Sequence, residues 1–368
     1  MQLHKITLPE VLSGLPDVVP FDSQNVGQDD LFICALGFEE RALQFPRELT
    51  RANYRANHAL YLTYDTNITD NERNLPDLRT SLLKLSSQQS MLNVDDTKFI
   101  ASFSDLMDSL CSEVGTPRVT LDISAGANRL ILSCMHVLLN HNVMLHLLYS
   151  EAAIYFPTQD EYLQSKQLGE VAEISPEHGV DDIVVSPIHA GEHLDPLPEA
   201  VILFPSFKKD RSISVINEVD ESLVFDPGEK VIWLLGEPRL PGDQWRMQAM
   251  REINEIAGGA PQFPVSTFEY KATLRILDSL HDKLSQNFNI TVSMIGSKLQ
   301  AVGASLFLYQ HPGVRALIAK PVEYHARHYS SGCKAMWSIN FGATQDLRLK
   351  LDSVGGLVLT SLQKVDES

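Results

Sequence analysis

The chain repeats one arrangement of residues at an offset of about 170 positions over most of its 368 residues. Four pairs of landmarks keep this offset: Phe38 and Phe207, Arg41 and Arg211, Arg129 and Lys298, and Tyr155 and Tyr324. The text Leu106-Met-Asp-Ser-Leu110 also recurs, as Ile276-Leu-Asp-Ser-Leu280. Self-similarity at a fixed period is the signature of a repeated structural unit. We therefore expect an internal tandem duplication.

Short apolar runs of strand length alternate with helical segments in each half. The expected strands lie at 31–36, 59–64, 119–122 and 143–149, and then at 201–206, 231–235, 290–294 and 314–319. The longer expected helices lie at 75–85, 104–114, 129–140, 244–256, 270–284 and 299–310. Apolar strands that alternate with helices are typical of a parallel sheet covered on both faces. The sequence predicts an α/β fold with two Rossmann-like parallel-sheet units in tandem.

Changes in composition predict five parts along the chain. These are an N-terminal arm (1–29), unit 1 (30–162), a linker or crossing segment (163–198), unit 2 (199–327) and a C-terminal β extension (328–368). The extension contains alternating segments at 336–341 and 357–360, which favour edge or antiparallel strands. We expect it to have no counterpart in the first half.

The composition excludes several classes of protein. A net charge of −17, without a visible stripe of basic residues, argues against a protein that coats duplex nucleic acid. No apolar run approaches the ~18 residues of a membrane helix, and the first residues lack the layout of a signal peptide. The four cysteines are scattered singly, which predicts neither a zinc site nor a disulfide framework. We expect a cytoplasmic protein that makes no contact with a membrane.

Four turns are candidates for ligand binding, because ligands of open parallel sheets bind beyond the carboxyl ends of the strands. Two of them, 37–41 and 206–211, follow the first strand of each unit. The other two, 122–129 and 295–298, follow the strands at 119–122 and 290–294, which we place fourth in a Rossmann-like unit. First and fourth strands are neighbours in such sheets, so we expect the turns of each unit to face each other.

The fourth-strand turns combine small residues with a cation. In unit 1, Ser124 and Gly126 would let backbone N–H groups approach an anion, and Arg129 could clamp a phosphate. The alternative is that these small and hydroxyl residues form an ordinary helix cap that binds no ligand. Arg129 would then be a charged residue at the surface. In unit 2 the candidates are the residues Gly296, Ser297 and Lys298. Neither turn is a Walker A loop or a G-x-G-x-x-G motif.

The first-strand turns each carry an arginine and a phenylalanine. Arg41 and Arg211 are candidate contacts to a phosphate or a base. Phe38 and Phe207 could stack on a base, although packing is the more common role of such residues.

The remaining candidates are weaker. Arg73 and Arg246 lie beyond the second strands and could reach the rim of the cleft, but a solvated arginine near a helix start is the favoured interpretation for both. Glu151 could bind a ribose hydroxyl or cap a turn. His325 and His328 have an H-x-x-H spacing without a third ligand, so we expect neither a metal nor a cofactor.

The segment from Asp122 to Arg129 resembles the fourth-strand motif of the CRISPR-associated Rossmann fold (CARF) sensor domains. That motif has an acidic residue, a hydroxyl residue, glycines and a lysine. This chain keeps Asp122, Ser124 and Gly126, but has Ala and Asn in the rest of the turn and Arg129 in place of the lysine. The second half lacks the acidic residue. The resemblance implies binding of a cyclic oligonucleotide, and a related SAVED-like family of anti-phage defence fuses two such units in one chain.

Three hypotheses follow. The first is a sensor or regulatory subunit of a prokaryotic defence system that binds a nucleotide or cyclic oligonucleotide between its units and acts on a separate effector protein. The second is a nucleotide-processing enzyme, a phosphodiesterase or a glycosidic-bond-cleaving enzyme, with Asp122, Glu39 and Glu40 as acid and base groups. The third is a scaffold subunit with a vestigial pocket.

Overall fold

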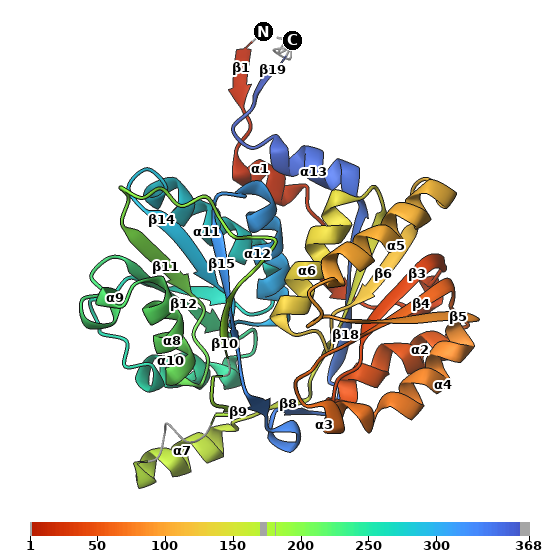
Figure 1. Cartoon of the computed structure of the whole chain (residues 1–368), viewed down its shortest axis with the longest axis horizontal. Helices are drawn as coiled ribbons and strands as arrows, with labels where there is room; N and C mark the ends of the chain where they lie inside the picture. Colours follow the sequence, from red (N-terminus) through yellow and green to blue (C-terminus); the bar gives the residue numbers. More distant parts are fainter. Residues whose placement is uncertain (1, 170–174, 181, 361–368) are drawn as a thin grey trace, which may run out of the picture.

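A computed structural model describes residues 2–169, 175–180 and 182–360. Two lobes lie side by side, each a twisted sheet with helices against it (Figure 1). The fold class predicted from the sequence, α/β with two Rossmann-like units, is confirmed.

Unit 1 contains five parallel strands in the order β7-β6-β3-β4-β5. They are β3 (Gln28–Ala35), β4 (Arg55–Thr63), β5 (Gln88–Asn93), β6 (Arg118–Asp122) and β7 (Met144–Glu151). The main helices are α2 (Gln44–Arg51), α4 (Leu75–Leu85), α5 (Phe99–Val114) and α6 (Asn128–Asn140). Alternate residues of β3 lie on opposite faces of the sheet. Ile33 packs in the core with α5 and α6, and Phe32 packs in the core with α2 and α4. This two-sided burial explains why β3 is a continuous apolar run.

Unit 2 has the same arrangement, in the order β15-β14-β11-β12-β13. Its strands are β11 (Glu199–Leu203), β12 (Val231–Glu237), β13 (Gln262–Ser266), β14 (Asn289–Ser293) and β15 (Arg315–Lys320). Its main helices are α8 (Lys209–Val219), α10 (Trp245–Ile253), α11 (Tyr270–Leu284) and α12 (Lys298–Gln310). Rossmann-like units commonly share this order. The order therefore agrees with a duplication without establishing one.

The third strand of each unit, β5 and β13, is not marked by an apolar run in the sequence. Both lie at the edge of their sheets. An edge strand is only half covered, so β5 reads Gln-Gln-Ser-Met-Leu-Asn and β13 includes Pro264.

The two fourth-strand helices, α6 and α12, pack against each other at the centre of the molecule (Figure 1). Both are apolar over most of their length, and the residues of α12 from Leu299 to Leu308 are all buried. One hydrophobic core runs through them from the sheet of unit 1 to the sheet of unit 2. A helix that is apolar all round is expected in such a buried position.

The two units exchange edge strands. After β7 the chain forms β8 (Ile154–Tyr155), α7 (Gln159–Leu168) and β9 (Glu177–His178), and then adds β10 (Asp182–Val185) antiparallel to β15 of unit 2. After β15 it forms β16 (Glu323–Tyr324) and β17 (Ser330–Ser331), and then adds β18 (Ala335–Ala343) antiparallel to β7 of unit 1. We call the part from β8 to β9 the first crossing segment and the part from β16 to β17 the second. The two crossing segments also pair with each other, β8 with β17 and β16 with β9.

The C-terminal segment corrects one expectation. Its antiparallel strands are present at both expected places, as β18 and as β19 (Leu357–Thr360), which pairs with β1 (Gln2–Lys5). However, β18 does have a counterpart, namely β10, which occupies the same place in the other sheet. The expectation failed because the equivalent strands follow the fifth strand of one unit and join the sheet of the other, a relation that no local sequence pattern carries.

Candidate functional site

A cavity of about 380 Å³ lies between the two units. Its lining comes from the ends of, or the segments after, each of the ten parallel strands, so the carboxyl ends of both sheets face the same space. All four turns that the sequence marks as candidates contribute to it: 37–41, 122–129, 206–211 and 295–298. The volume is in the range of small-molecule sites, about 300–1,000 Å³.

The fourth-strand turn of each unit touches the segment that follows the first strand, as the strand order requires. A Cβ atom placed on Gly37 would lie 2.8 Å from the Cβ of Ala125, so only glycine allows this approach. In unit 2, a Cβ on Gly296 would lie 3.2 Å from the Cδ1 of Phe204, just before the first-strand turn. Glycine is needed where two backbones come this close.

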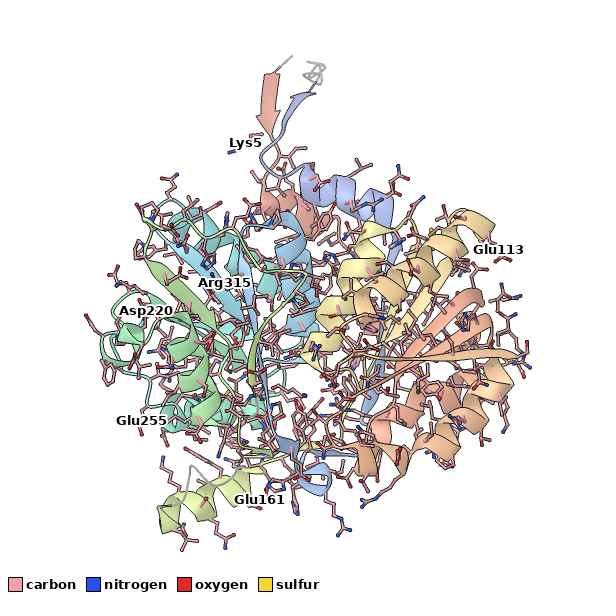
Figure 2. All side chains as sticks on the ribbon, in the orientation of Figure 1. Lys5, Glu113, Glu161, Asp220, Glu255 and Arg315 are labelled. Carbon is pink, nitrogen blue, oxygen red and sulfur yellow. The ribbon has the colours of Figure 1, made fainter. Side chains whose placement is uncertain are left out.

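The lining of the cavity is more positive than the rest of the chain. It contains seven cationic residues, Arg41, Arg129, Arg211, Arg239, Arg246, Lys298 and Lys320, and five acidic ones, Glu39, Asp95, Glu151, Glu177 and Asp243. The chain as a whole has a net charge of −17, and acidic side chains such as Glu113, Asp220 and Glu255 lie around its outside (Figure 2). A local excess of positive charge in an acidic protein favours an anionic ligand.

Arg41 is almost completely buried and holds the unit 1 side of the cavity together. Its guanidinium donates to Glu39 Oε1 at 2.6 and 2.9 Å, to the carbonyl of Ser150 at 3.3 Å and to the hydroxyl of Tyr155 at 3.2 Å. Burial raises the pKa of Glu39, but the charges of Arg41 and Lys298 and the hydrogen bonds from Ser330 and Arg41 together lower it by more, so the net shift is downward. Most of the donors of Arg41 are therefore used within the protein.

Arg211 makes the matching contacts in unit 2. Its guanidinium donates to the carbonyl of Ala319 at 2.5 Å and forms a close ion pair with Glu177 of the crossing segment β9. Its Nε is buried and has no hydrogen-bond partner among the described residues. Both first-strand arginines therefore line the cavity, yet each is already neutralised by a carboxylate.

Arg129 also lines the cavity and forms a close ion pair with Asp95, which follows β5. Its side chain is 27% exposed, so part of the guanidinium remains accessible. The helix that it begins, α6, has Ala127 at the N-cap position and no side-chain cap. The N–H of Ala127 donates to the hydroxyl of Tyr64 at 2.8 Å, and the N–H groups that follow it lie with Arg129 at the start of α6, next to the cavity.

Ser124 does not line the cavity. Its side chain is fully buried and donates to Asp122, while its Oγ accepts a hydrogen bond of 2.8 Å from the backbone N–H of Ser150. Burial raises the pKa of Asp122 to about 7, although the hydrogen bonds from Ser124 act in the opposite direction. These two residues fix the turn between β6 and α6, and neither of them lines the cavity.

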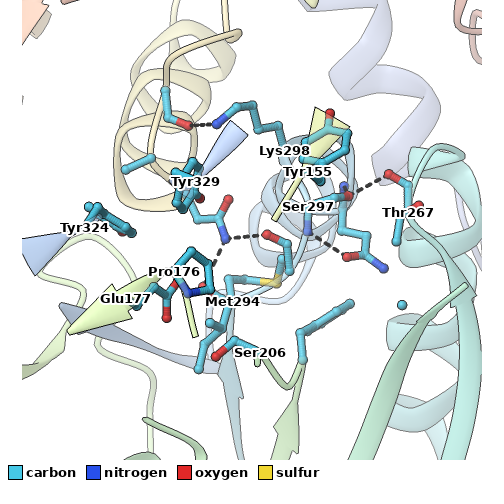
Figure 3. Close-up of a pocket in the computed structure, with 18 of the residues that line it drawn as sticks. Tyr155, Pro176, Glu177, Ser206, Thr267, Met294, Ser297, Lys298, Tyr324 and Tyr329 are labelled. Carbon is cyan, nitrogen blue, oxygen red and sulfur yellow. Dashed lines mark hydrogen bonds between the residues drawn. The ribbon is translucent and has the colours of Figure 1, made fainter. Parts of the chain in front are cut away.

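Ser297 has a similar capping role in unit 2. Its Oγ accepts from the N–H of Gln300 at 3.2 Å and donates to the carbonyl of Thr267 at 2.6 Å (Figure 3). The Gln300 side chain in turn accepts from the N–H of Ser297 at 2.8 Å, which completes a capping box. The start of α12 is therefore closed by its own side chains, whereas the start of α6 is not.

The two fourth-strand turns are linked by a reciprocal pair of hydrogen bonds. Asn128 Nδ2 donates to the carbonyl of Gly296 at 2.9 Å, and Lys298 Nζ donates to the carbonyl of Gly126 at 2.9 Å (Figure 3). Each donor is the first residue of its helix. The structural counterpart of Lys298 is therefore Asn128, and the sequence match of Lys298 with Arg129 is shifted by one residue.

Several aromatic side chains of the cavity are absent from the ligand contacts that the sequence predicts, although Tyr155 and Tyr324 are a landmark pair of the repeat. The ring centroids of Tyr324 and Tyr329, from the second crossing segment, lie 6.1 and 5.7 Å from that of Phe38 and 5.2 Å from each other. The hydroxyls of Tyr149 and Tyr155 are 2.8 Å apart. Tyr155, Tyr324 and Tyr329 lie in segments that cross between the units, so no local motif marks them as ligand contacts.

Two further arginines lie on aromatic faces. The guanidinium of Arg239 is 4.8 Å from the ring centroid of Phe268 and 2.9 Å from Glu151, so Glu151 binds a cation within the protein. Arg246, which the sequence favours as a solvated residue, lines the cavity and is 5.6 Å from the ring of Phe207. Arg73 does lie at the surface, 61% exposed and paired with Asp70.

The candidate acid and base groups are poorly placed for catalysis. Asp122 lies behind the turn, and Glu40 is outside the cavity lining and accepts from the N–H of Gly332 at 3.0 Å. Glu39 reaches the cavity but is bound by Arg41 and by the hydroxyl of Ser330 at 2.5 Å. No group of three side chains suited to a metal is found in residues 2–169, 175–180 and 182–360.

Comparison with known proteins assigns no family. No family model matches the chain, and no curated protein matches it. Among solved structures, it is similar to the cytoplasmic domain of a prokaryotic cation chloride cotransporter, with 8% identity, a TM-score of 0.23, and 82% of this chain and 99% of that chain covered. It is also similar to dihydropteroate synthase from Thermus thermophilus, with 13% identity, a TM-score of 0.15, and 83% and 93% covered.

These scores are too low to carry any argument about function. Within the part of the chain that the structure describes, no helix is both long and apolar enough to cross a membrane.

Proposed function

We propose that the chain binds one nucleotide-type anion in the cavity between its two units and acts as a ligand-sensing or regulatory subunit. The observation that carries this proposal is the cavity itself, which is positively charged, rich in aromatic side chains and built jointly by the strand ends of both units. Phosphates require cations and N–H donors, and bases require flat apolar surfaces.

The start of α6 is the proposed place for a phosphate. Arg129 is partly exposed there, and Lys298 reaches the same turn from unit 2. The helix has no side-chain cap, so an anion would meet backbone donors and the positive end of the helix. The start of α12 lacks this property because Ser297 and Gln300 cap it.

The aromatic cluster of Phe38, Tyr324 and Tyr329 is the proposed place for a base. The three rings all line the cavity. Burial raises the pKa of Tyr324 to about 12, so its hydroxyl stays protonated and can donate to a ring nitrogen or carbonyl. Base stacking on aromatic rings contributes about 1–3 kcal/mol per base.

Sensing fits the site better than catalysis. Four of the five carboxylates that line the cavity, Glu39, Asp95, Glu151 and Glu177, are paired with arginines. The same cavity contains the hydrogen bonds that link the units. A bound anion would compete for Lys298 and thereby change the contact between the units. The resemblance of the turn from Asp122 to Arg129 to CARF motifs supports a cyclic oligonucleotide as the ligand, a separate effector protein and a role in prokaryotic anti-phage defence.

Isothermal titration calorimetry with mononucleotides, cyclic dinucleotides, larger cyclic oligoadenylates and inorganic phosphate tests the proposal. We expect at least one nucleotide to bind, and Arg129→Gln to weaken it by about 1.5–3 kcal/mol, the contribution of a hydrogen bond to a charged group. Arg73→Gln is the matched control, because Arg73 lies outside the cavity. Absence of binding by every nucleotide at millimolar concentration would refute the proposal, and turnover of a bound nucleotide would favour the enzyme hypothesis.

A further inference from the structure

Lys298 differs from four of the five arginines of the cavity in its electrostatic surroundings, and the fifth, Arg246, donates to the carbonyls of Tyr155 and Pro157. Four of those arginines have a carboxylate in direct contact: Arg41, Arg129, Arg211 and Arg239. The nearest carboxylate oxygen to Lys298 Nζ is Glu39 Oε2, at 4.0 Å, and Glu39 is already bound by Arg41. The side chain of Lys298 is only 11% exposed, so this amine has lost most of its water without gaining a close counter-ion.

The hydrogen bond that Lys298 makes does not require a lysine. Asn128, at the equivalent position of unit 1, makes the same bond to the turn of the other unit with a neutral amide. Burying an ammonium costs more free energy than burying an amide. The linkage of the units therefore explains why a donor is needed at this position, but not why the donor in unit 2 is an amine.

Burial and neighbouring charge give this amine a property that an amide lacks. Burial lowers the pKa of Lys298, the positive charge of Arg41 lowers it further, and the net result is a pKa of about 8. At pH 8 about half of the molecules then carry a neutral amine, against less than about one in a hundred for a lysine with an ordinary pKa of about 10.4. A desolvated lysine next to another cation is the usual form of a nucleophilic lysine.

We propose that Lys298 captures the carbonyl group of an anionic aldehyde or ketone as an imine. The lone pair of the neutral Nζ attacks the carbonyl carbon, the carbonyl oxygen takes up protons and departs as water, and a C=N bond replaces the C=O bond. No oxidant or reductant takes part. Arg129 lines the same cavity and is partly exposed, so it would hold the anionic group of the ligand. This inference rests on the ligand cavity of the proposed function, but not on the ligand being a nucleotide.

Reductive trapping tests the inference on the wild-type chain. The protein is mixed with pyridoxal 5′-phosphate, reduced with sodium borohydride and mapped by peptide mass spectrometry. We expect Lys298 to be labelled at least about tenfold faster than Lys283, an exposed lysine of the same unit, with a rate that rises with pH around a midpoint near 8. Pyridoxal without the phosphate should label Lys298 more slowly, because it lacks the anionic group.

Matched variants complete the test. Lys298→Arg keeps a cation and Lys298→Asn takes the residue of the equivalent position, and both should remove the adduct at 298 while Lys283 is still labelled. Labelling of Lys298 no faster than Lys283 in the wild-type chain would overturn the inference, and this result does not depend on how the variants fold. A wild-type chain that binds nucleotides but traps no imine overturns this inference alone, and the opposite outcome overturns only the proposed function.

Discussion

Arg41 and Arg211 occupy equivalent places and make equivalent bonds. Each leaves the segment after the first strand of its unit and donates to a backbone carbonyl at the end of the fifth strand, at Ser150 and Ala319 respectively. Each is also paired with a buried carboxylate. The two arginines therefore brace the two sides of the cavity from within the protein, in addition to any contact with a ligand.

Removing either arginine should destabilise the fold. Arg41→Met would leave Glu39 buried without its main partner, and Arg211→Met would do the same to Glu177. We expect each to lower the free energy of unfolding by about 3–5 kcal/mol, the usual cost of breaking a buried ion pair. Arg73→Met, which breaks an exposed pair, should change it by less than about 1 kcal/mol in the same urea titration. Losses below about 1 kcal/mol at positions 41 and 211 would contradict the bracing role.

The contact between the two turns of unit 1 predicts a rescue. Gly37→Ala places a Cβ within 2.8 Å of the Cβ of Ala125 and should cost about 1–3 kcal/mol of stability. Ala125→Gly in the same chain should recover most of that loss, since it removes the clashing atom. Gly259→Ala, where a new Cβ meets nothing within 4 Å, serves as the control and should be neutral or slightly stabilising. Additive effects of the two substitutions at 37 and 125 would show that these turns do not touch.

The pKa of Lys298 predicts how stability depends on pH. The pKa of Lys298, about 8, lies below the pKa of 10.5 of a free lysine. Between pH 8 and pH 10.5 the unfolded chain therefore binds more protons than the folded chain. Stability contributed by this group therefore rises as the pH increases from 8 towards 10.5. Lys298→Met removes this titrating group. The free energy of unfolding of the variant relative to the wild type should therefore decrease by about 3 kcal/mol from pH 8 to pH 10.5, measured by urea unfolding. A pH-independent difference would mean that Lys298 titrates normally.

The raised pKa of Asp122 predicts that stability changes with pH in the opposite direction at lower pH. Burial raises its pKa from 3.8 to about 7, so between these values the folded chain binds more protons and stability falls as the pH rises. Asp122→Asn keeps an acceptor for Ser124 but cannot ionise. The variant should therefore gain roughly 3 to 5 kcal/mol relative to the wild type between pH 4 and pH 7. Parallel curves for the two proteins would place the titration of Asp122 outside this range.

The sequence predicts the parts of the fold that local patterns encode. The helices 75–85 and 270–284 occur with the predicted ends, and the apolar strands occur where their runs are. The strands β5 and β13 were not predicted, because half-covered edge strands need no apolar run. The exchange of β10 and β18 was not predicted either, because the choice of sheet depends on contacts between distant parts of the chain.

The sequence predicts that the four turns converge, but not which of their side chains are already paired within the protein. Strand order alone brings the four turns together. However, the carboxylates that neutralise Arg129 and Arg211, Asp95 and Glu177, come from an edge-strand loop and a crossing segment. Their partnership depends on tertiary structure, so the sequence presents both arginines as free ligand contacts.

The central claim is the proposal that one ligand is held between the two units. Hydrogen–deuterium exchange of the chain, with and without whichever nucleotide binds in the calorimetric titrations, tests it most directly. We expect protection to rise together in the segments 37–41 and 122–129 of unit 1 and 206–211 and 295–298 of unit 2, which all line the cavity. Protection confined to one unit, or to a surface away from these four segments, would contradict the claim.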